Sequence, residues 1–280
     1  MTPTWLRPLA ALVPAAAALA ALALSSASCG ARSELASCEI PGETRPCATA
    51  CGPGVETCAQ GRWQGCTAPR PEDAIPITGT VRDFLQSHPD FEGPIADDRG
   101  MVEPALGEDG RPVYAGNPTT PTTNGKERFD EWFRDVEGIN LSAPHTITLE
   151  RAPENALLYR FNDQAFFPID GALLGDEGNP HNYHFTFELA VNFRYVGGEI
   201  FAFSGDDDLW VFINGRLAID LGGVHGVQSQ AVVLDERAEQ LRIEVGEVYP
   251  LALFFAERHT SSSTFRIDTT IADFEVCPEP

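Results

Sequence analysis

The stretch LWVFINGRLAID, residues 209–220, limits the possible folds more than any other part of the chain. An Asn-Gly pair, Asn214-Gly215, separates two runs of mostly apolar residues. Such a pair tolerates the positive φ angles of a tight type I′ turn, so the stretch predicts two antiparallel strands. Side chains alternate between the faces of a strand, and both faces are apolar here, which predicts a central hairpin covered on both sides. One face would carry Leu209, Val211, Ile213, Leu217, Ile219 and Leu221, and the other Trp210 and Phe212.

Similar apolar segments with turn residues between them recur over residues 71–280 and predict an all-β domain, an antiparallel β-sandwich or barrel. Helix signals are few. Apolar residues at spacings of three and four predict a short surface helix over 125–136, and 79–91 is a second candidate that ends near Pro89. Strands are expected within 145–150, 156–161, 181–196, 198–203, 209–213, 216–221, 230–235, 241–245, 249–258 and 264–276.

Residues 1–28 predict an export signal. One basic residue, Arg7, precedes an Ala/Leu run from Pro8 to Leu24 that is short for a membrane-spanning helix. Cys29 follows small residues directly, which resembles a bacterial lipoprotein signal in which the cysteine is cleaved and lipidated. This reading predicts an outer-membrane or cell-surface lipoprotein whose only membrane contact is the lipid anchor. The alternative is an ordinary cut after Ala27 and a secreted protein.

The cysteines fit an exported chain. There are seven, and an odd number leaves one thiol over unless Cys29 carries lipid. In an oxidising compartment the other six are expected to form disulfides. Segment 29–70 is too short to bury a core, so cross-links would substitute for one, and the segment is interpreted as a stapled stalk or a small binding module. The six are Cys38, Cys47, Cys51, Cys58, Cys66 and Cys277.

The charge balance excludes some classes of partner. The formal net charge is −22, which argues against nucleic acid and anionic membrane surfaces and suits divalent cations. The sequence contains no G-x-S-x-G elbow, metalloprotease helix or P-loop. A non-enzymatic protein is therefore expected.

Three consecutive aspartates, Asp206 to Asp208, stand at the entry to the hairpin. Neighbouring carboxylates between apolar strands repel each other and lose solvation, so something must compensate their charge. A Ca²⁺ ion, which accepts oxygen ligands with loose geometry, is one candidate. The alternative is that the aspartates cap a turn by accepting hydrogen bonds from backbone N–H groups.

Four motifs together resemble the fibro-slime domain, within the lectin-like β-domain superfamily named after the anthrax protective antigen. The resemblance covers about residues 77–273. It implies a β-sandwich or barrel with a role in carbohydrate binding or adhesion. The motifs are GTVRDFLQSHPDFE, FNDQAFFPIDGALLGDEG with HNYHFTFEL, GDDDLWVFINGRLAIDLGGVHG and YPLALFFAERHTSSSTFRID.

The resemblance also implies a site. In the adhesin members, two adjacent aspartates joined by a cis peptide chelate Ca²⁺, and alignment on the hairpin turn places this pair on Asp206 and Asp207. Asp208 is included as a third candidate metal ligand. A second loop supplies an Asn ligand in the adhesins, but the matching segment here, 257–264, has no Asn. His225, Arg258 and His259 are candidate ligand-binding residues together with Asp206 and Asp207.

The function predicted from these features is a cell-surface or secreted carbohydrate-binding or adhesion protein with a calcium-dependent site and a glycan as partner. A purely structural envelope or matrix component without a ligand is the second hypothesis. A glycan hydrolase is the third.

Overall fold

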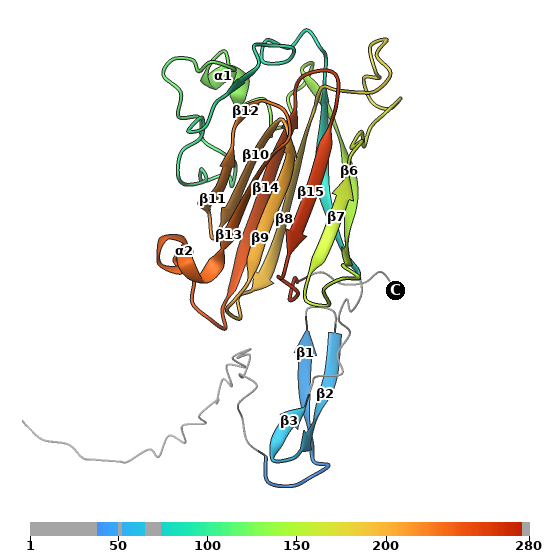
Figure 1. Ribbon diagram of the computed structural model, residues 1–280, viewed down its shortest axis with the longest axis vertical. Coiled ribbons are helices and arrows are strands. Elements are labelled where there is room, and N and C mark those ends of the chain that lie inside the picture. Colours follow the sequence, from blue (N-terminus) through green and yellow to red (C-terminus); the bar gives the residue numbers. More distant parts are fainter. Residues whose placement is uncertain (1–37, 50–51, 65–73, 276–280) are drawn as a thin grey trace, which may run out of the picture. The chain divides into compact units, whose positions relative to one another are not determined.

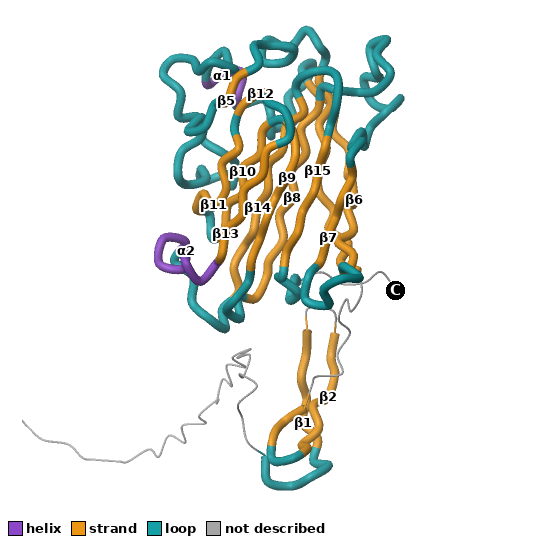
Figure 2. Tube along the Cα trace, viewed as in Figure 1, coloured by secondary structure: helices purple, strands orange, loops and turns teal. Residues whose placement is uncertain are grey.

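The computed structural model describes residues 38–49, 52–64 and 74–275 (Figure 1). Strands dominate these ranges, with two short helices, so the all-β prediction is confirmed. Figure 2 shows how much of the chain is strand and how much is connecting loop. The predicted export signal and the predicted lipidation site Cys29 lie outside the described ranges. No helix within these ranges has the length and apolar character needed to cross a membrane.

A small three-stranded antiparallel sheet comes first in the chain. It contains β1 (Thr44–Thr49), β2 (Gly52–Ala59) and β3 (Arg62–Gln64). A disulfide joins Cys38 to Cys58, so the prediction is confirmed for this pair. For the other predicted disulfide cysteines, the side chain of Cys47 and all of Cys51, Cys66 and Cys277 lie outside what the structure describes.

A ten-stranded antiparallel sheet forms the large domain, in the order β11-β10-β14-β8-β4-β6-β7-β15-β9-β13. The two ends of this order approach each other, since Asp220 N on β11 donates to Gln230 Oε1 on β13 at 3.3 Å. The sheet is therefore nearly closed, as the barrel prediction requires. The strands are β4 (Ala74–Phe84), β6 (Asn140–Arg151), β7 (Tyr159–Asp163), β8 (Phe185–Arg194), β9 (Ile200–Asp206), β10 (Asp208–Ile213), β11 (Arg216–Leu221), β13 (Gln228–Val233), β14 (Val248–Glu257) and β15 (Thr264–Thr269).

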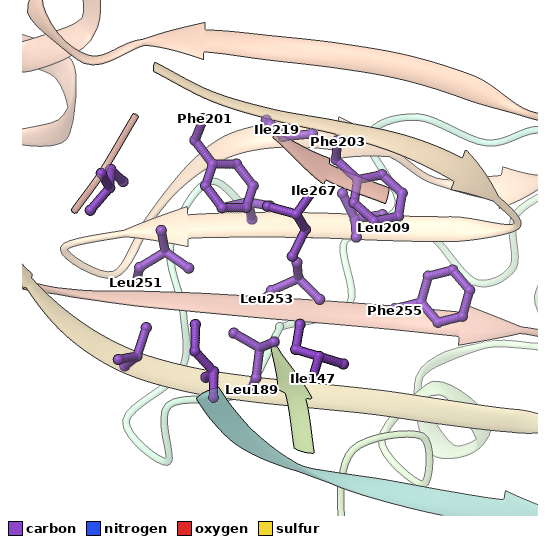
Figure 3. Close-up of a cluster of buried hydrophobic side chains, with 14 of the residues drawn as sticks. Ile147, Leu189, Phe201, Phe203, Leu209, Ile219, Leu251, Leu253, Phe255 and Ile267 are labelled. Carbon is purple, nitrogen blue, oxygen red and sulfur yellow. The ribbon is translucent and has the colours of Figure 1, made fainter. Parts of the chain in front are cut away.

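The main core lies on the inner face of the sheet. Strand alternation brings every second residue to this face, and the buried side chains from facing strands pack together (Figure 3). Among them, Leu209, Leu253 and Phe255 come from the two neighbouring strands β10 and β14. This core holds the strands that end at the three aspartates.

A second apolar cluster covers the outer face of β10 and β14. It is formed by their outward residues, such as Trp210 and Phe254, together with Trp132 and Phe133 from the segment between β5 (Ala96–Asp97) and β6. Trp210 and Phe212 thus lie on the opposite face from Leu209 and Val211, and the prediction of a hairpin buried on both faces is confirmed. Leu217, predicted on the face of Leu209, instead packs against the second cluster, because the pairing of β10 and β11 shifts register between Val211 and Phe212.

The Asn-Gly turn has the predicted conformation. Asn214 has φ 51° and Gly215 φ 68°, so both turn residues adopt the positive values that a type I′ hairpin needs. The predicted central position is only half right. β10 lies between β11 and β14, but β11 is the last strand of the sheet order.

The helix predicted within 79–91 is wrong, because β4 runs through Phe84 and pairs with both β6 and β8. Gly79 lies so close to β8 that a Cβ there would stand 2.2 Å from the Glu188 carbonyl oxygen. Pairing with two neighbouring strands satisfies backbone groups along β4 that a helix would have bonded internally.

The helix predicted over 125–136 is shorter than expected. Only α1 (Lys126–Phe129) is helical, and turns follow. Side chains from elsewhere bind the carbonyls that a longer helix would have used. Thr186 Oγ1 donates to Trp132 O at 2.6 Å, and Asn140 Nδ2 donates to Arg134 O at 2.9 Å.

The strand expected within 241–245 is also wrong. A helix that was not predicted, α2 (Leu234–Leu241), ends there, and Arg242 adopts a left-handed conformation with φ 56°. Leu241, Ile243 and Val245 alternate with polar residues, which is a pattern typical of a strand. In the structure, Leu241 and Ile243 are buried and Val245 is exposed.

Candidate functional site

The three aspartates lie where β9 ends and β10 begins (Figure 1). Strand pairing sets Thr264 of β15 opposite Asp206 of β9, and β14 pairs with β10. The loop between β14 and β15, residues 258–263, is therefore adjacent to the aspartates. The peptide bond between Asp206 and Asp207 is cis, as the resemblance predicts.

Asp206 and Asp207 are buried carboxylates that each accept two hydrogen bonds. A carboxylate oxygen has two lone pairs, so each oxygen keeps acceptor capacity for another partner. Turn capping, the alternative to metal binding, accounts for only part of this capacity. Asp206 Oδ1 accepts a hydrogen bond from Thr264 N at 2.5 Å, and its Oδ2 accepts one from Ser262 Oγ at 3.1 Å. Asp207 Oδ1 accepts one from His225 N at 3.0 Å, and its Oδ2 accepts one from Arg258 N at 3.2 Å.

Burial makes the negative charge of these groups costly. It raises the pKa of Asp207 to about 7, the Asp208 carboxylate adds to this rise, and the Arg258 guanidinium partly opposes it. Burial also raises the pKa of Asp206, against the hydrogen bond from Thr264 N. Both shifts mean that the protein does not fully compensate the charge of the pair.

Glu257 is a third buried carboxylate next to the pair. It has no exposed surface, and burial, followed by the charges of Asp207 and Asp206, raises its pKa well above the usual value. Its Oε1 accepts a long hydrogen bond from His259 N at 3.5 Å, while Oε2 accepts none from the residues that the structure describes. A cation near Asp206 and Asp207 would lower the free energy of all three groups.

Asp208 is turned away from this group and forms an ion pair with Arg258. Its Oδ2 lies 2.6 Å from Arg258 Nε, both side chains are fully buried, and Oδ1 accepts a hydrogen bond from Gly223 N at 2.5 Å. The Arg258 guanidinium also stacks on Trp132 and donates to Thr122 O. Arg258 therefore has no surface with which to contact a ligand, contrary to the prediction for this residue.

The two candidate histidines both line the cavity next to the aspartates. The imidazole of His225 is nearly buried, with Nδ1 2.9 Å from Gly226 O and Nε2 3.2 Å from Leu221 O. His259 is half-buried, and its Nδ1 lies 2.5 Å from Thr260 O. Both histidines lie at the site, but the ring of His225 is directed to its own loop.

A cavity of about 140 Å³ opens at this place. Of the candidate residues, Asp206, Asp207, His225 and His259 line this cavity, whereas Asp208 and Arg258 do not. The lining residues are Ile95, Asp206, Asp207, Val224, His225, Gly226, His259, Thr260, Ser261 and Ser262.

Glu92 positions the loop after β14 and was missed by the sequence analysis. Its Oε1 accepts hydrogen bonds from Thr260 N at 2.9 Å and lies 2.9 Å from His184 Nε2, while Glu92 N donates to Arg258 O at 2.8 Å. Glu92 and Thr260 are 168 residues apart, so no local sequence pattern reveals their contact.

The donor chemistry of the cavity fits a Ca²⁺ ion, because hard oxygen ligands are what this ion prefers. The fit is incomplete with acidic side chains alone. In the ranges that the structure describes, no group of three or more His, Cys, Asp or Glu side chains is arranged to hold a metal ion. A cation on Asp206 and Asp207 would thus need further oxygen atoms from hydroxyls, main-chain carbonyls, water or a ligand.

Comparisons with curated proteins find relatives that are longer than this chain. Protein psiR of Dictyostelium discoideum is 38% identical over 218 residues, which cover 72% of this chain and 22% of the relative. Protein psiD of the same organism is 38% identical over 219 residues, which cover 71% of this chain and 42% of the relative. The chain therefore spans less than half the length of each of these two relatives.

Solved structures give weaker likenesses. The PA14 sugar-binding domain from an RTX adhesin is 12% identical, with a TM-score of 0.25, over 40% of this chain and 69% of that chain. The Epithelial Adhesin 9 A domain from Candida glabrata, in complex with Galb1-4GlcNAc, is 15% identical, with a TM-score of 0.29, over 74% of this chain and 86% of that chain. TM-scores this low carry no argument about the site.

A family match identifies the part of the chain that holds the site. Residues 163–274 match the model of the PA14 domain family. This range contains the aspartates and the loop between β14 and β15. The finer resemblance, to the fibro-slime domain, stays a prediction. The match shows that residues 163–274, less than half of the chain, are similar to PA14 domains.

Proposed function

We propose that the protein is a non-catalytic carbohydrate-binding or adhesion protein that acts outside the cell and binds its glycan through Ca²⁺. The observation that carries this proposal is the pair Asp206 and Asp207. Both line an open cavity, both keep acceptor capacity on their carboxylate oxygens, and burial raises the pKa of each.

In this proposal the residues have separate roles. Asp206 and Asp207 hold the cation, and the cation supplies open coordination positions that hydroxyl groups of a sugar can occupy. Glu257 adds negative charge behind the pair. Asp208 and Arg258 hold the two strand ends together from the outer face, which makes Asp208 a supporting residue and not a ligand.

The walls of the cavity would contact the sugar directly. Thr260, Ser261 and Ser262 carry hydroxyl groups that can both donate and accept hydrogen bonds. His259 lies at the start of this wall. Ser262 has a second task, because its hydroxyl donates to Asp206 and fixes the wall to the cation-binding pair.

The match of residues 163–274 to the PA14 domain family supports a binding domain, in line with what the resemblance implies. The Epithelial Adhesin 9 structure contains Galb1-4GlcNAc, but the proposal rests on the site and not on that likeness. An extracellular or cell-surface location follows from the predicted export signal. Lipidation of Cys29 remains part of the proposal.

Two other functions remain as outcomes of the test. A structural envelope component without a ligand would neither bind Ca²⁺ nor a glycan. A hydrolase would turn a glycan over, which product analysis after incubation detects.

The deciding experiment is a glycan array probed with the purified protein in Ca²⁺ and again in chelator. Binding that requires Ca²⁺, is lost in Asp207→Asn and persists in Asp273→Asn supports the proposal. Asp273 is a suitable control because it is a largely exposed carboxylate that pairs with Arg194. Binding that is equal with and without chelator would contradict the role of calcium, and no binding to any glycan would contradict the function.

A further inference from the structure

The two walls of the cavity differ in chemistry. One wall, residues 259–262, carries a histidine and three hydroxyl side chains. The other contains Ile95 and Val224. Val224 is buried, whereas Ile95 is 70% exposed although it lines the same cavity as the Asp206 and Asp207 carboxylates. We call Ile95 the apolar lip.

Ile95 is held in place by strand pairing. β5 pairs with β12 (Gly223–Val224) so that Ala96 lies opposite Val224, and the next antiparallel position sets Ile95 opposite His225. Asp98 N continues the contact by donating to Gly222 O at 2.7 Å. The exposure of Ile95 is thus fixed by the backbone.

The base of the lip is fixed as well. Gln228, next to Val227, donates a side-chain hydrogen bond to Asp97, and its Oε1 accepts one from Arg99 at 2.7 Å. The short strand β5, which follows Ile95, is therefore bonded both to β12 and to Gln228 of β13. When a ligand covers an apolar side chain at the mouth of a polar cavity, the removal of that side chain from water favours binding.

The kind of apolar contact is limited by what lines the cavity. Apart from the two imidazoles, none of the described lining residues is aromatic. A flat ring such as Trp would suit the face of a pyranose, whereas branched aliphatic side chains suit a compact group such as methyl.

We infer that the glycan presents a methyl group to Ile95 while its neighbouring hydroxyls face the cation. This inference rests on the proposed function and names the class of sugar. Two common sugars have this chemistry. A 6-deoxyhexose carries the methyl on C5, and an N-acetylhexosamine carries it on the acetamido group.

Matched sugar pairs test the inference with one group changed at a time. Methyl α-L-fucoside differs from methyl α-L-galactoside only in lacking the 6-hydroxyl, and an N-acetylgalactosaminide differs from its N-formyl analogue by one methyl. Titration calorimetry in Ca²⁺ should show about fourfold or more tighter binding for the methyl-bearing member of at least one pair, as expected for one buried methyl group. The pair that discriminates identifies the source of the methyl.

A second test replaces the side chain of the apolar lip. Ile95→Ser should abolish the preference within the discriminating pair while leaving the Ca²⁺-induced rise in melting temperature unchanged. Val245→Ser is the control, because Val245 is 67% exposed on a different loop and should leave the preference intact. Saturation-transfer NMR should also show the strongest transfer to the ligand methyl in the native protein and a loss of this transfer in Ile95→Ser.

Equal affinities within both pairs would overturn the inference and leave the proposed function standing. The same holds if Ile95→Ser keeps the preference. A third outcome is that none of the four sugars binds to protein that Ca²⁺ stabilises. If the glycan array is positive, this result overturns the methyl contact alone. If the glycan array is negative, it overturns the proposed function as well.

Discussion

Asp208 and Arg258 form an ion pair in which neither side chain has any exposed surface, with 2.6 Å between Oδ2 and Nε. The pair joins the start of β10 to the residue after β14. Removing one partner of a buried pair typically costs about 3–5 kcal/mol, because the other charge stays buried without compensation.

Asp208→Ala and Arg258→Ala should therefore each lower the free energy of unfolding by about this amount in urea titrations. The double variant should cost less than the sum, because no isolated charge remains. A double-mutant cycle measures this coupling. Costs that simply add would show that the two side chains act independently.

Ca²⁺ should raise the melting temperature through Asp206 and Asp207. Binding to the native state alone stabilises by about 2.7 kcal/mol at a hundredfold excess over Kd, which corresponds to several degrees. Asp207→Ala should abolish the response of metal-free protein to added Ca²⁺. Asp208→Asn should weaken it less, because Asp208 binds Arg258 and not the cavity.

Differential scanning fluorimetry with Ca²⁺ and with chelator measures the effect. Asp273→Asn should respond like the native protein. A melting temperature that ignores Ca²⁺ and chelator in protein shown to be metal-free would leave turn capping as the role of Asp206 and Asp207.

The local parts of the site could be predicted from the sequence. Asn214-Gly215 defines the hairpin because turn chemistry depends only on adjacent residues. The three aspartates precede this turn by one strand length, so the hairpin also places them at the start of β10. His259 and the hydroxyls after it directly follow the strand predicted over 249–258, so their approach to the aspartates depends only on the pairing of β14 and β10.

The long-range contacts could not be predicted in this way. Arg258 is 50 residues from Asp208, and Glu92 is 168 residues from Thr260. These contacts depend on the order of strands in the sheet. Ile95 reaches the cavity through the two-residue strand β5, whose pairing with β12 has no hydrophobic pattern to reveal it.

Tertiary contacts also explain the wrong helix predictions. Carbonyls after α1 accept hydrogen bonds from Asn140 and Thr186, so the periodic apolar residues pack without a regular helix. The apolar spacing there correctly predicts that Phe129, Trp132 and Phe133 are buried, but it does not predict the backbone conformation.

The disulfide between Cys38 and Cys58 should stabilise the small sheet. It spans 20 residues, for which loop closure predicts about 3 kcal/mol. Mass mapping of unreduced protein should find the peptide pair that contains Cys38 and Cys58. Cys58→Ser should make residues 38–64 more sensitive to limited proteolysis, without altering the Ca²⁺ response of the large domain. Unchanged cleavage rates would show that the sheet does not depend on this bond.

Gly223→Ala should damage the site. Gly223 has φ +122°, and a Cβ there would stand 2.3 Å from Ala96 O. Its N–H also donates to Asp208. Strain at such a position costs on the order of 1–3 kcal/mol, so we expect a loss of about 2 kcal/mol or more in urea unfolding. Gly226→Ala is the matched control, since nothing lies within 4 Å of its Cβ position, and equal losses in both variants would contradict the argument.

Asp83 should make stability fall as the pH rises from about 4 to 6. This carboxyl is fully buried in β4, and burial raises its pKa from 3.8 to about 6, against hydrogen bonds from Asn182 Nδ2 and Leu174 N. Because the folded pKa exceeds the unfolded value, the folded protein binds more protons in this window. The contribution of Asp83 to stability is therefore greatest below pH 4 and is lost as the pH passes 6.

Asp83→Asn removes this titration. The free energy of unfolding of the variant, relative to the native protein, should increase by up to about 3 kcal/mol between pH 4 and pH 7. Urea titrations at four pH values in this range measure the difference. Asp176→Asn, a partly exposed carboxylate whose Oδ1 accepts a hydrogen bond from Gly171 N, is the control. A difference between Asp83→Asn and the native protein that stays constant over this range would show that Asp83 does not titrate there, because only a group with different folded and unfolded pKa values makes the difference depend on pH.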